Sequence, residues 1–389
     1  MSTGLIRQRY AAIAVKIEST VGTDAIADSP VAGDFIAGEV EISFDQDQFS
    51  NNELTASLDR APSIPGRVGA SVRIRMPLRG SGAAGTAPEW GKLLRACAMA
   101  ETITGSAVGA PTACTAGTST SATLASPFAA TDQLYRGMPL LLTGTPADET
   151  VITNYTSGRV ATVGNTLASS PSASTNAQIP INVRYSPTSD ESVFKTVTIY
   201  SYADGVVWKF VGCSGSWGIE LNSGGIGFLT FDMRATPTAY GSAVALPAAA
   251  VGITRQTPPR FINRKMQFGN EVAKLRSLAL QAGVNVVLPD NPEAAEGVDA
   301  AVPTARQVSG TIDPLMSTTS SAGRWTRFSA GTSASMIAII GSTAGNRFAL
   351  SCPAVRTVRL NPGARDDLGV DAIGFEADGP DASVFLTAY

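Results

Sequence analysis

The sequence has 389 residues, with 29 Lys and Arg against 32 Asp and Glu, 44% apolar residues and no histidine. Catalysis by a Ser-His-Asp or Cys-His pair, zinc binding through histidine and pH switching by an imidazole are therefore excluded. A net charge of −3 provides no overall basic surface for nucleic-acid phosphates, and the apolar fraction is enough for a sizeable core within roughly two to three domains.

The N-terminus, the apolar runs and the cysteines bear on where the protein is made. Residues 1–9 contain no apolar stretch, so we expect no signal peptide. The longest apolar runs, around Ala245–Ile253 and Ala334–Ile340, are too short to span a bilayer. No two cysteines have the spacing of a CxxC redox or zinc motif, which favours buried thiols in a reducing compartment: Cys97, Cys114, Cys213 and Cys352. We therefore expect synthesis in a cytoplasm and no membrane partner.

Strand-like segments dominate the chain. They are rich in β-branched and aromatic residues, and several are separated by Asp-Gly or Gly-Gly turns. Alternation of apolar and polar positions predicts sheets with one buried and one polar face, and hence a mainly β fold. The clearest segments are Glu39–Phe44, Ser71–Met76, Phe194–Tyr202, Val206–Cys213, Ser216–Leu221 and Ile226–Met233.

One segment after the second of these strands has helical periodicity. Thr86 and Glu89 have the spacing of a capping box, and Pro88 suits the first turn of a helix. Apolar residues then recur at i, i+3, i+4 and i+7: Trp90, Leu93, Leu94 and Cys97. We predict a helix that ends near Glu101 and packs this stripe against the sheet, with a subunit interface as the alternative.

The composition changes between residues 104 and 190. Thr104–Ser126 consists almost entirely of Ser, Thr, Ala and Gly. The whole segment holds few charged residues: Asp132, Arg136, Asp148, Glu149, Arg159, Arg184 and Asp190. Strand signals nevertheless occur at Met138–Leu142, Thr150–Tyr155, Arg159–Val163 and Ile179–Tyr185. We predict that residues 104–190 form a small inserted β domain with a flexible entrance.

Two parts of the chain resemble each other, which indicates an internal repeat. Cys213 and Cys352 end similar segments, Lys209–Cys213 and Arg347–Cys352, and their positions differ by 139 (352 less 213). Further upstream, the positions of Pro77 and Pro314 differ by 237 (314 less 77). The second offset exceeds the first by 98 (237 less 139), which is close to the length of the low-charge segment. We therefore predict one β-rich unit that occurs twice and is interrupted by the insertion in its first occurrence.

Further matches support the repeat. Phe231 and Phe375, each followed by an acidic residue, end similar strands, and Trp90 and Trp325 have nearly the same offset as the two prolines. The second unit keeps the helix poorly, because residues 322–325 lack a clear apolar stripe. The predicted division is residues 1–103 with 191–242 for the first unit, 104–190 for the insertion and 243–389 for the second unit.

Long polar segments lie between paired strands in both units, at residues 45–66 and 289–303. Loops of this length inside a compact domain are usually functional or ordered by a partner. The first contains side chains suited to Ca²⁺, but it lacks the glycine at position six and the acid at position twelve of an EF-hand, so a solvated hairpin loop is the better interpretation: Asp45, Asp47, Asn51, Asn52 and Glu53.

Gly80, Gly82 and Gly85 fit a GxGxxG pattern between a strand and a helix, where a dinucleotide could bind, and Glu101 could serve as the distal acid. However, no second parallel strand follows the helix, and no later alternation of strands and helices appears. We interpret the segment as a flexible loop before a helix. We predict no catalytic residue, no cofactor and no metal ligand.

Two segments carry a family resemblance. The sequence from Gly85 to Cys97 resembles the major tail (tail tube) proteins of long-tailed bacteriophages, as does the turn Tyr202–Gly205 that leads into Phe210–Gly215. The resemblance covers the first unit without its insertion and, more loosely, the second unit. It implies β-sandwich or barrel units, each with a short flanking helix, whose sheets join side by side into rings. Such rings stack into a hollow tube around the tape-measure protein and, later, the DNA.

The resemblance also implies partners and a location. Residues 45–66 and 289–303 would reach the neighbouring ring, and residues 104–190 would project outside the tube. A duplicated subunit points to a trimeric ring with pseudo-sixfold symmetry, with a hexamer as the alternative. Tail terminator and distal tail proteins would bind the tube ends, and DNA would pass through the lumen without specific binding. We predict a structural protein of the virion tail with no enzymatic activity. The alternatives are a head-decoration or tail-fibre protein and, less favoured, a nucleotide-dependent enzyme.

Overall fold

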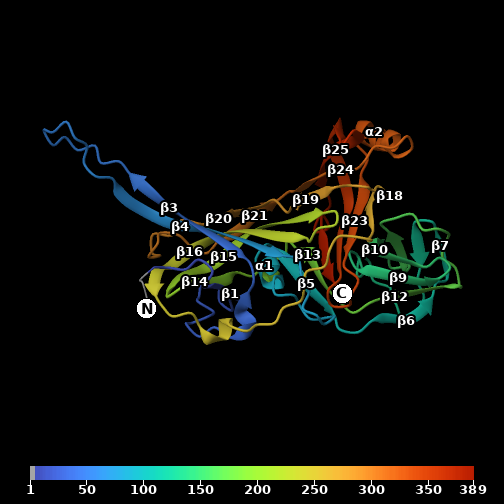
Figure 1. Cartoon of the computed structure of the whole chain (residues 1–389), viewed down its shortest axis with the longest axis horizontal. Helices are drawn as coiled ribbons and strands as arrows, with labels where there is room; N and C mark the ends of the chain where they lie inside the picture. The colour runs from blue at the N-terminus through green and yellow to red at the C-terminus, as the bar shows by residue number, and fades with distance from the viewer. Residues whose placement is uncertain (1–4) are drawn as a thin grey trace.

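The computed structural model describes residues 5–389, and most of their regular structure is β-strand (Figure 1). Seventeen strands belong to one large branched sheet, seven form a second sheet, and two form a short ribbon. The only α-helices in these residues are α1 (Gly91–Arg95) and α2 (Ser320–Ala330), and short 3-10 turns occur at Ala32–Asp34, Glu191–Val193 and Ala248–Ala250. The predicted mainly β fold is confirmed.

Seven antiparallel strands make up what we call the first sheet unit. Along one of its strands, β4, every second side chain from Ala70 to Met76 is buried, as an alternating sequence with one apolar face requires. In spatial order the strands are β3 (Glu39–Phe49), β4 (Ile64–Pro77), β16 (Phe228–Ala243), β15 (Val206–Asn222), β14 (Val197–Ala203), β1 (Ala11–Ile17) and β2 (Phe35–Ile36).

The second sheet unit has the same order of strands, again all antiparallel. Its first hairpin is prolonged by the ribbon of β20 (Val284–Val287) and β21 (Val302–Arg306). In spatial order the strands are β19 (Ser277–Gln281), β22 (Val308–Ile312), β25 (Leu368–Ala377), β24 (Phe348–Arg365), β23 (Ala334–Ile340), β17 (Met266–Phe268) and β18 (Glu271–Val272).

The offset of the repeat also appears in the pairing of the strands. Cys213 of β15 pairs with Val197 of β14, and Cys352 of β24 pairs with Met336 of β23. The two partners are displaced along the sequence by the same offset as the two cysteines (336 less 197 equals 352 less 213). All four side chains belong to one hydrophobic cluster that runs through both units. Equivalent strands therefore contribute equivalent side chains to a common core.

Several predicted strand limits were wrong. Segments 206–213 and 216–221 form a single strand, β15, because Gly212 (φ 58°) is accommodated as an irregularity in its pairing and does not end it. The polar segment 45–66 is not all loop either. β3 continues to Phe49 and β4 begins at Ile64, so that only the residues between them form the connection.

The predicted helix is shorter than expected. α1 ends at Arg95, and a strand, β5 (Met99–Thr104), already includes Glu101. The capping box does not form. Glu89 pairs with Arg255 instead, at 3.0 Å. The apolar stripe is nevertheless confirmed as core, because these side chains are fully buried: Trp90, Leu93, Leu94 and Cys97. Burial against the sheet thus fixes the segment, while a backbone with positive φ at Ala98 (54°) ends its helical turns.

Residues 108–179 form the separate seven-stranded sheet, which has its own hydrophobic cluster. The serine- and threonine-rich segment, expected to be a flexible entrance, contains three of its strands, and the predicted strand 179–185 is divided at Pro180. In spatial order the strands are β6 (Val108–Ala113), β12 (Thr175–Ile179), β9 (Pro139–Gly144), β10 (Asp148–Tyr155), β11 (Val160–Val163), β8 (Ser121–Thr123) and β7 (Ala116–Thr118).

The inserted sheet is attached to the large sheet at two places. β5, which precedes it, pairs with β13 (Asn182–Pro187), which follows it, so the chain leaves and returns at neighbouring points. β13 also pairs with the last strand, β26 (Phe385–Ala388). At the second place, Glu149 of β10 accepts hydrogen bonds from the Tyr389 hydroxyl at 2.9 Å and from Arg264 at 3.0 Å. The insertion therefore rests on the second sheet unit.

Candidate assembly surfaces

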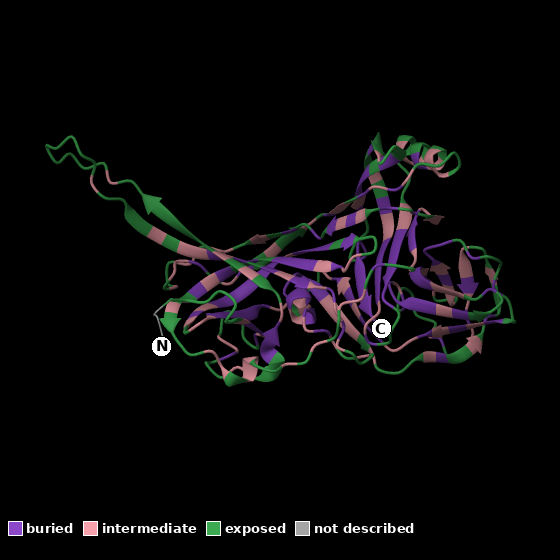
Figure 2. Ribbon diagram, in the orientation of Figure 1, coloured by how far each residue is buried: buried purple, intermediate pink, exposed green. Residues whose placement is uncertain are grey.

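The hairpin of β3 and β4 forms an arm that projects from the body of the molecule (Figure 1). Its strands pair as far as Phe49 and Ile64, and residues 50–63 form the tip. Figure 2 shows that exposed residues dominate this tip. Leu54 and Leu58 are 102% and 109% exposed there, more than any other large apolar residue described. Apolar side chains held in water in this way mark a candidate contact with another protein.

The corresponding hairpin of the second unit packs on the first unit instead. Its tip, residues 288–301, folds back over β4 and β15. The Val68 N–H donates to the carbonyl of Glu296 at 3.0 Å, and the Ala301 N–H donates to the carbonyl of Gly212 at 2.9 Å. These backbone hydrogen bonds hold the tip of the second hairpin against the first unit, whereas residues 50–63, the tip of the arm, form no backbone hydrogen bond with any other segment within residues 5–389.

The two units are joined through β15 and β19. The first part of β15 pairs with β14, and its last part, Gly218–Asn222, pairs with β19. In this register Ile219 faces Leu280 and Leu221 faces Leu278, and all four side chains are buried. Burial of a leucine or isoleucine side chain contributes about 1.5–3 kcal/mol. The joint is therefore a stable continuation of the sheet from one unit into the next.

At the two outer ends of the pair of units, the strand edges that correspond to this joint have no partner within the described chain. Among residues 5–389, no strand pairs with the outer edge of β3, or with the edge of β24 beyond Val355 that faces away from β25. Unpaired edges present rows of free N–H and C=O groups, which proteins usually cover or pair with another chain. These two edges are candidate assembly surfaces. The sequence did not reveal them, because no local pattern reports which strand lies beside β15.

The polar face of the first unit carries charges of alternating sign. Arg73 lies 3.4 Å from Asp232, and Arg75 lies 3.9 Å from Glu39 and 4.0 Å from Glu220. These side chains are between 40% and 81% exposed, so each pair adds little to stability. Their effect is to keep the face close to electrically neutral, without the basic stripe that strong phosphate binding requires.

The glycine-rich segment has a structural role. The Gly80 N–H donates to Asn346 Oδ1 at 2.8 Å, and the Gly82 N–H donates to the carbonyl of Gly345 at 3.2 Å. A Cβ atom on Gly80 would lie only 1.9 Å from the Gly345 oxygen. Glycine is therefore needed at this position so that a turn of the second unit can approach closely. Both donors point at protein atoms, and Gly85 belongs to the same loop.

Two of the acidic residues considered as Ca²⁺ ligands are paired with arginines. Asp45 lies 3.1 Å from Arg234, and Asp47 lies 2.7 Å from Arg67. The remaining candidates for Ca²⁺ ligands lie in the exposed tip of the arm: Asn51, Asn52 and Glu53. Among the residues that the structure describes, no group of three or more acidic or cysteine side chains is placed to hold a metal ion.

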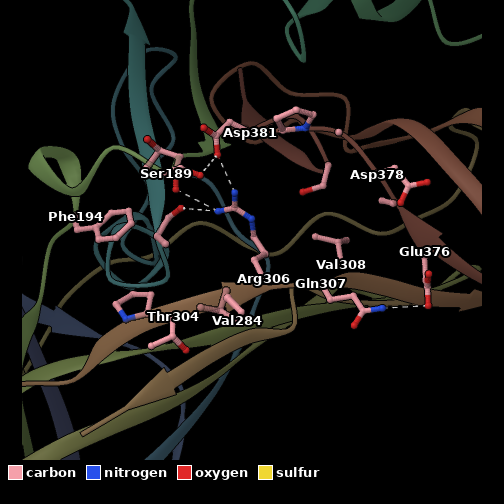
Figure 3. Close-up of a pocket in the computed structure, with 18 of the residues that line it drawn as sticks. Ser189, Phe194, Val284, Thr304, Arg306, Gln307, Val308, Glu376, Asp378 and Asp381 are labelled. Atoms are coloured by element: carbon pink, nitrogen blue, oxygen red, sulfur yellow. Dashed lines mark hydrogen bonds and ion pairs between the residues drawn. The ribbon is translucent and has the colours of Figure 1, made fainter. Parts of the chain in front are cut away.

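A cavity of about 530 Å³ lies where the second hairpin meets the segments around β5 and β26 (Figure 3). Arg306 extends into it and donates to Asp381 at 2.9 Å and to the carbonyl of Ala98 at 3.2 Å. Ser189 donates to the same carboxylate at 2.7 Å. The guanidinium thus ties three segments of the chain together, and the lining residues are engaged in structural contacts.

The cysteines are buried and unpaired with one another, as predicted. Burial raises the pKa of all four thiols, so the reactive thiolate is disfavoured. Cys213 and Cys352 occupy matching positions in the two units, which agrees with a packing role.

One polar feature of the second unit was not predicted. Arg324 of α2 lies 2.8 Å from Asp371 of β25, and both side chains are almost completely buried. The guanidinium also donates to the carbonyl of Leu315 at 3.1 Å. In the sequence these residues look like ordinary surface charges. Trp325, the counterpart of the buried Trp90 in the predicted repeat, is 39% exposed.

The strand order, the open edges and the projecting arm define a β-rich structural protein. A family model described as phage tail tube protein matches residues 9–379. The chain therefore belongs to the phage tail tube protein family, and the resemblance seen in the sequence is confirmed. It is a structural protein of the phage tail. The curated proteins include no significant match to the sequence. Neither helix found within residues 5–389 is long and apolar enough to cross a membrane.

Proposed function

We propose that this protein polymerises into stacked rings that form the tail tube, through which DNA is delivered. The proposal rests on the repeated order of seven strands. Inside the chain, β19 of the second unit pairs with β15 of the first, whereas the corresponding edges at the two outer ends, on β3 and β24, have no partner strand among the described residues. Chains that present complementary open edges associate head to tail, and such contacts produce rings or helical filaments. Enzymatic activity has no part in this role.

Two units per chain favour a ring of three protomers with pseudo-sixfold symmetry. The division that we propose is residues 1–103 with 191–242 and 243–389, each a tube unit with its short flanking helix, and 104–190 as an insertion outside the tube. The arm, within residues 45–66, reaches the neighbouring ring. Residues 289–303 contribute less to stacking, because their backbone is already bonded to the first unit of the same chain.

Further partners follow from a tube of this kind. The tape-measure protein and then DNA occupy the lumen, and tail terminator and distal tail proteins bind the ends. A lumen should let DNA slide without specific binding. The alternating charges on the polar face and the net charge of −3 are compatible with that requirement, since neither provides a strong attraction for phosphates.

Negative-stain electron microscopy of the purified protein tests the proposal. We expect rings or tubes whose averaged end views have threefold symmetry around a sixfold-like lumen. A ring of six protomers would contradict the trimer. A protein that stays monomeric and copurifies with capsid shells would support a decoration role instead. Calorimetry addresses the enzyme alternative, which would be favoured only by tight nucleotide binding that is lost on Gly82→Asp.

A further inference from the structure

We propose that neighbouring protomers join by pairing β3 of one chain antiparallel with β24 of the next, in the register of the internal joint between β19 and β15. The proposal rests on the proposed function, because it requires that the protein forms rings. It specifies which strands meet and which residues face each other.

The residues on the edge of β24 that would pair with β3 of the neighbour are found by comparing β24 with β15. Leu229 and Ile373 occupy equivalent positions, because they lie two residues before Phe231 and Phe375, the phenylalanines that match in the repeat. Leu229 pairs with Ile219 on β15, and Ile373 pairs with Leu360 on β24. By this pairing Leu360 is the counterpart of Ile219, the residue of β15 that faces β19. Burial supports this choice over the cysteine offset of 139, which would give Val358 (219 plus 139): Leu360 is 4% exposed and Ile219 is fully buried, whereas Val358 is 46% exposed.

The residues on the edge of β3 that would pair with β24 are found in the same way. Ile74 of β4 pairs with Phe231 of β16 on one side and with Val40 of β3 on the other. Gly310 of β22 pairs with Phe375 of β25 and with Leu280 of β19. Val40 is therefore the counterpart of Leu280, the residue of β19 that faces β15.

The register between protomers follows directly. Since Ile219 faces Leu280 in the internal joint, Leu360 of one protomer faces Val40 of its neighbour. On the polar face, Arg359 then lies opposite Glu41. Both of these side chains are exposed, and neither forms an ion pair with another residue in the described range 5–389. Opposite charges directly across a strand pair favour this register.

The position of the arm agrees with this joint. In the second unit, pairing of β19 with β15 is accompanied by docking of the hairpin tip over the first unit. The arm is the equivalent hairpin, and it projects freely because the strand that should lie beside it belongs to another chain (Figure 1). Each protomer offers one β3 edge and one β24 edge, so internal and external joints alternate around a closed ring.

Disulfide trapping in assembled particles tests the register. Glu39 and Asn361 face each other in the proposed joint, as Ala279 and Glu220 do in the internal one. We expect the double variant Glu39→Cys with Asn361→Cys to form cross-linked dimers and trimers under mild oxidation. The native thiols are buried and should not compete. Glu39→Cys with Asp366→Cys, in the turn after β24, is the matched control and should give about tenfold less product.

The outcomes separate the two proposals. Tubes without the specific cross-link would overturn this joint and leave the proposed function intact. Absence of rings and tubes from the unmodified protein would overturn both. Charge exchange provides a second measurement that needs no oxidation. Glu41→Arg and Arg359→Glu should each lower the assembled fraction about tenfold, because like charges then meet, and the two together should restore assembly. If the combined variant assembled no better than the single ones, the joint would also be refuted.

Discussion

The two long hairpins of this chain hold the same place in their sheet units but differ in their surroundings. The hairpin of β19 and β22 lies beside β15, and its tip is bonded to the first unit. The hairpin of β3 and β4 has a free outer edge and a tip with fully exposed leucines. The docked hairpin gains a neighbouring strand and backbone hydrogen bonds for its tip within the same chain. Within the part of the chain that the structure describes, the hairpin of β3 and β4 lacks both, and in the proposed ring a second chain would supply them.

Substitutions in or beside the helices that follow the two hairpins should give the largest difference in the free energy of unfolding. Trp90 is completely buried beside α1, whereas Trp325 on α2 is 39% exposed. Trp90→Ala should lower the free energy of unfolding by about 3–5 kcal/mol, because it leaves a large cavity. Trp325→Ala should change it by less than about 1 kcal/mol. Urea denaturation of both variants measures the contrast. Equal losses would mean that the two segments are packed alike.

The buried ion pair of the second unit gives the next largest effect. Asp371→Ala should cost about 3 kcal/mol, because it leaves the Arg324 guanidinium buried without its counter-charge. Arg324→Met combined with Asp371→Leu removes both charges and should recover most of that loss. Thermal and urea unfolding of the single and double variants form the test. If the double variant were less stable than Asp371→Ala, the charges would have a role beyond mutual neutralisation.

The arm tip should affect assembly but not the folded protomer. Leu54→Ser with Leu58→Ser should leave the free energy of unfolding within about 0.5 kcal/mol, because both side chains are fully exposed. Loss of their burial between rings should weaken stacking by about 2 kcal/mol and give shorter tubes. Val251→Ser, at an exposed position of the body, is the control. Tube lengths measured by electron microscopy decide the matter, and unchanged lengths would exclude the tip from stacking.

The smallest effect concerns the turns that follow β14 and β23. Arg7 donates to Asp204 at 2.7 and 2.8 Å, and these hydrogen bonds lower the pKa of that carboxyl to about 2. The contact therefore stabilises the fold above the unfolded pKa of about 3.9, and its contribution is lost as the pH falls through about 2. In the second unit the turn is held by the backbone of Tyr389 instead. NMR titration of the Asp204 carboxyl checks this, and a midpoint near 4 would contradict it.

The predictable part of the fold was carried by local patterns. Alternation identified the central strands, and the offset between Cys213 and Cys352 matched the offset of the residues that pair with them. The length of α1 was overestimated because residues 96–98 suit a helix by composition, whereas in the structure they form a turn that ends with a positive φ at Ala98 and leads into β5. For a short apolar segment of this kind, the sequence alone does not show where a helix ends, because a helix and a turn can bury the same side chains.

The assembly surfaces could be predicted only in outline. The polar segments 45–66 and 289–303 stood out in the sequence by their length, but their sequences do not show that the tip of one is docked and the tip of the other is free. That difference depends on which strand lies beside β15, a contact between residues about 60 positions apart that has no local signature. The Arg324–Asp371 pair was missed for the same reason, since burial of a charge is decided by tertiary packing.

The attachment of the inserted sheet has a practical consequence. Thr104 and Asn182 face each other on adjacent strands, so the chain enters and leaves the insertion at two neighbouring points of the large sheet. A foreign domain whose two ends lie close together can be exchanged for the insertion at these points without altering the rest of the chain's strand order. In the proposed tube such a chimaera would carry its cargo at regular intervals along a nanometre-scale particle, which makes this position a natural site for displaying antigens or enzymes.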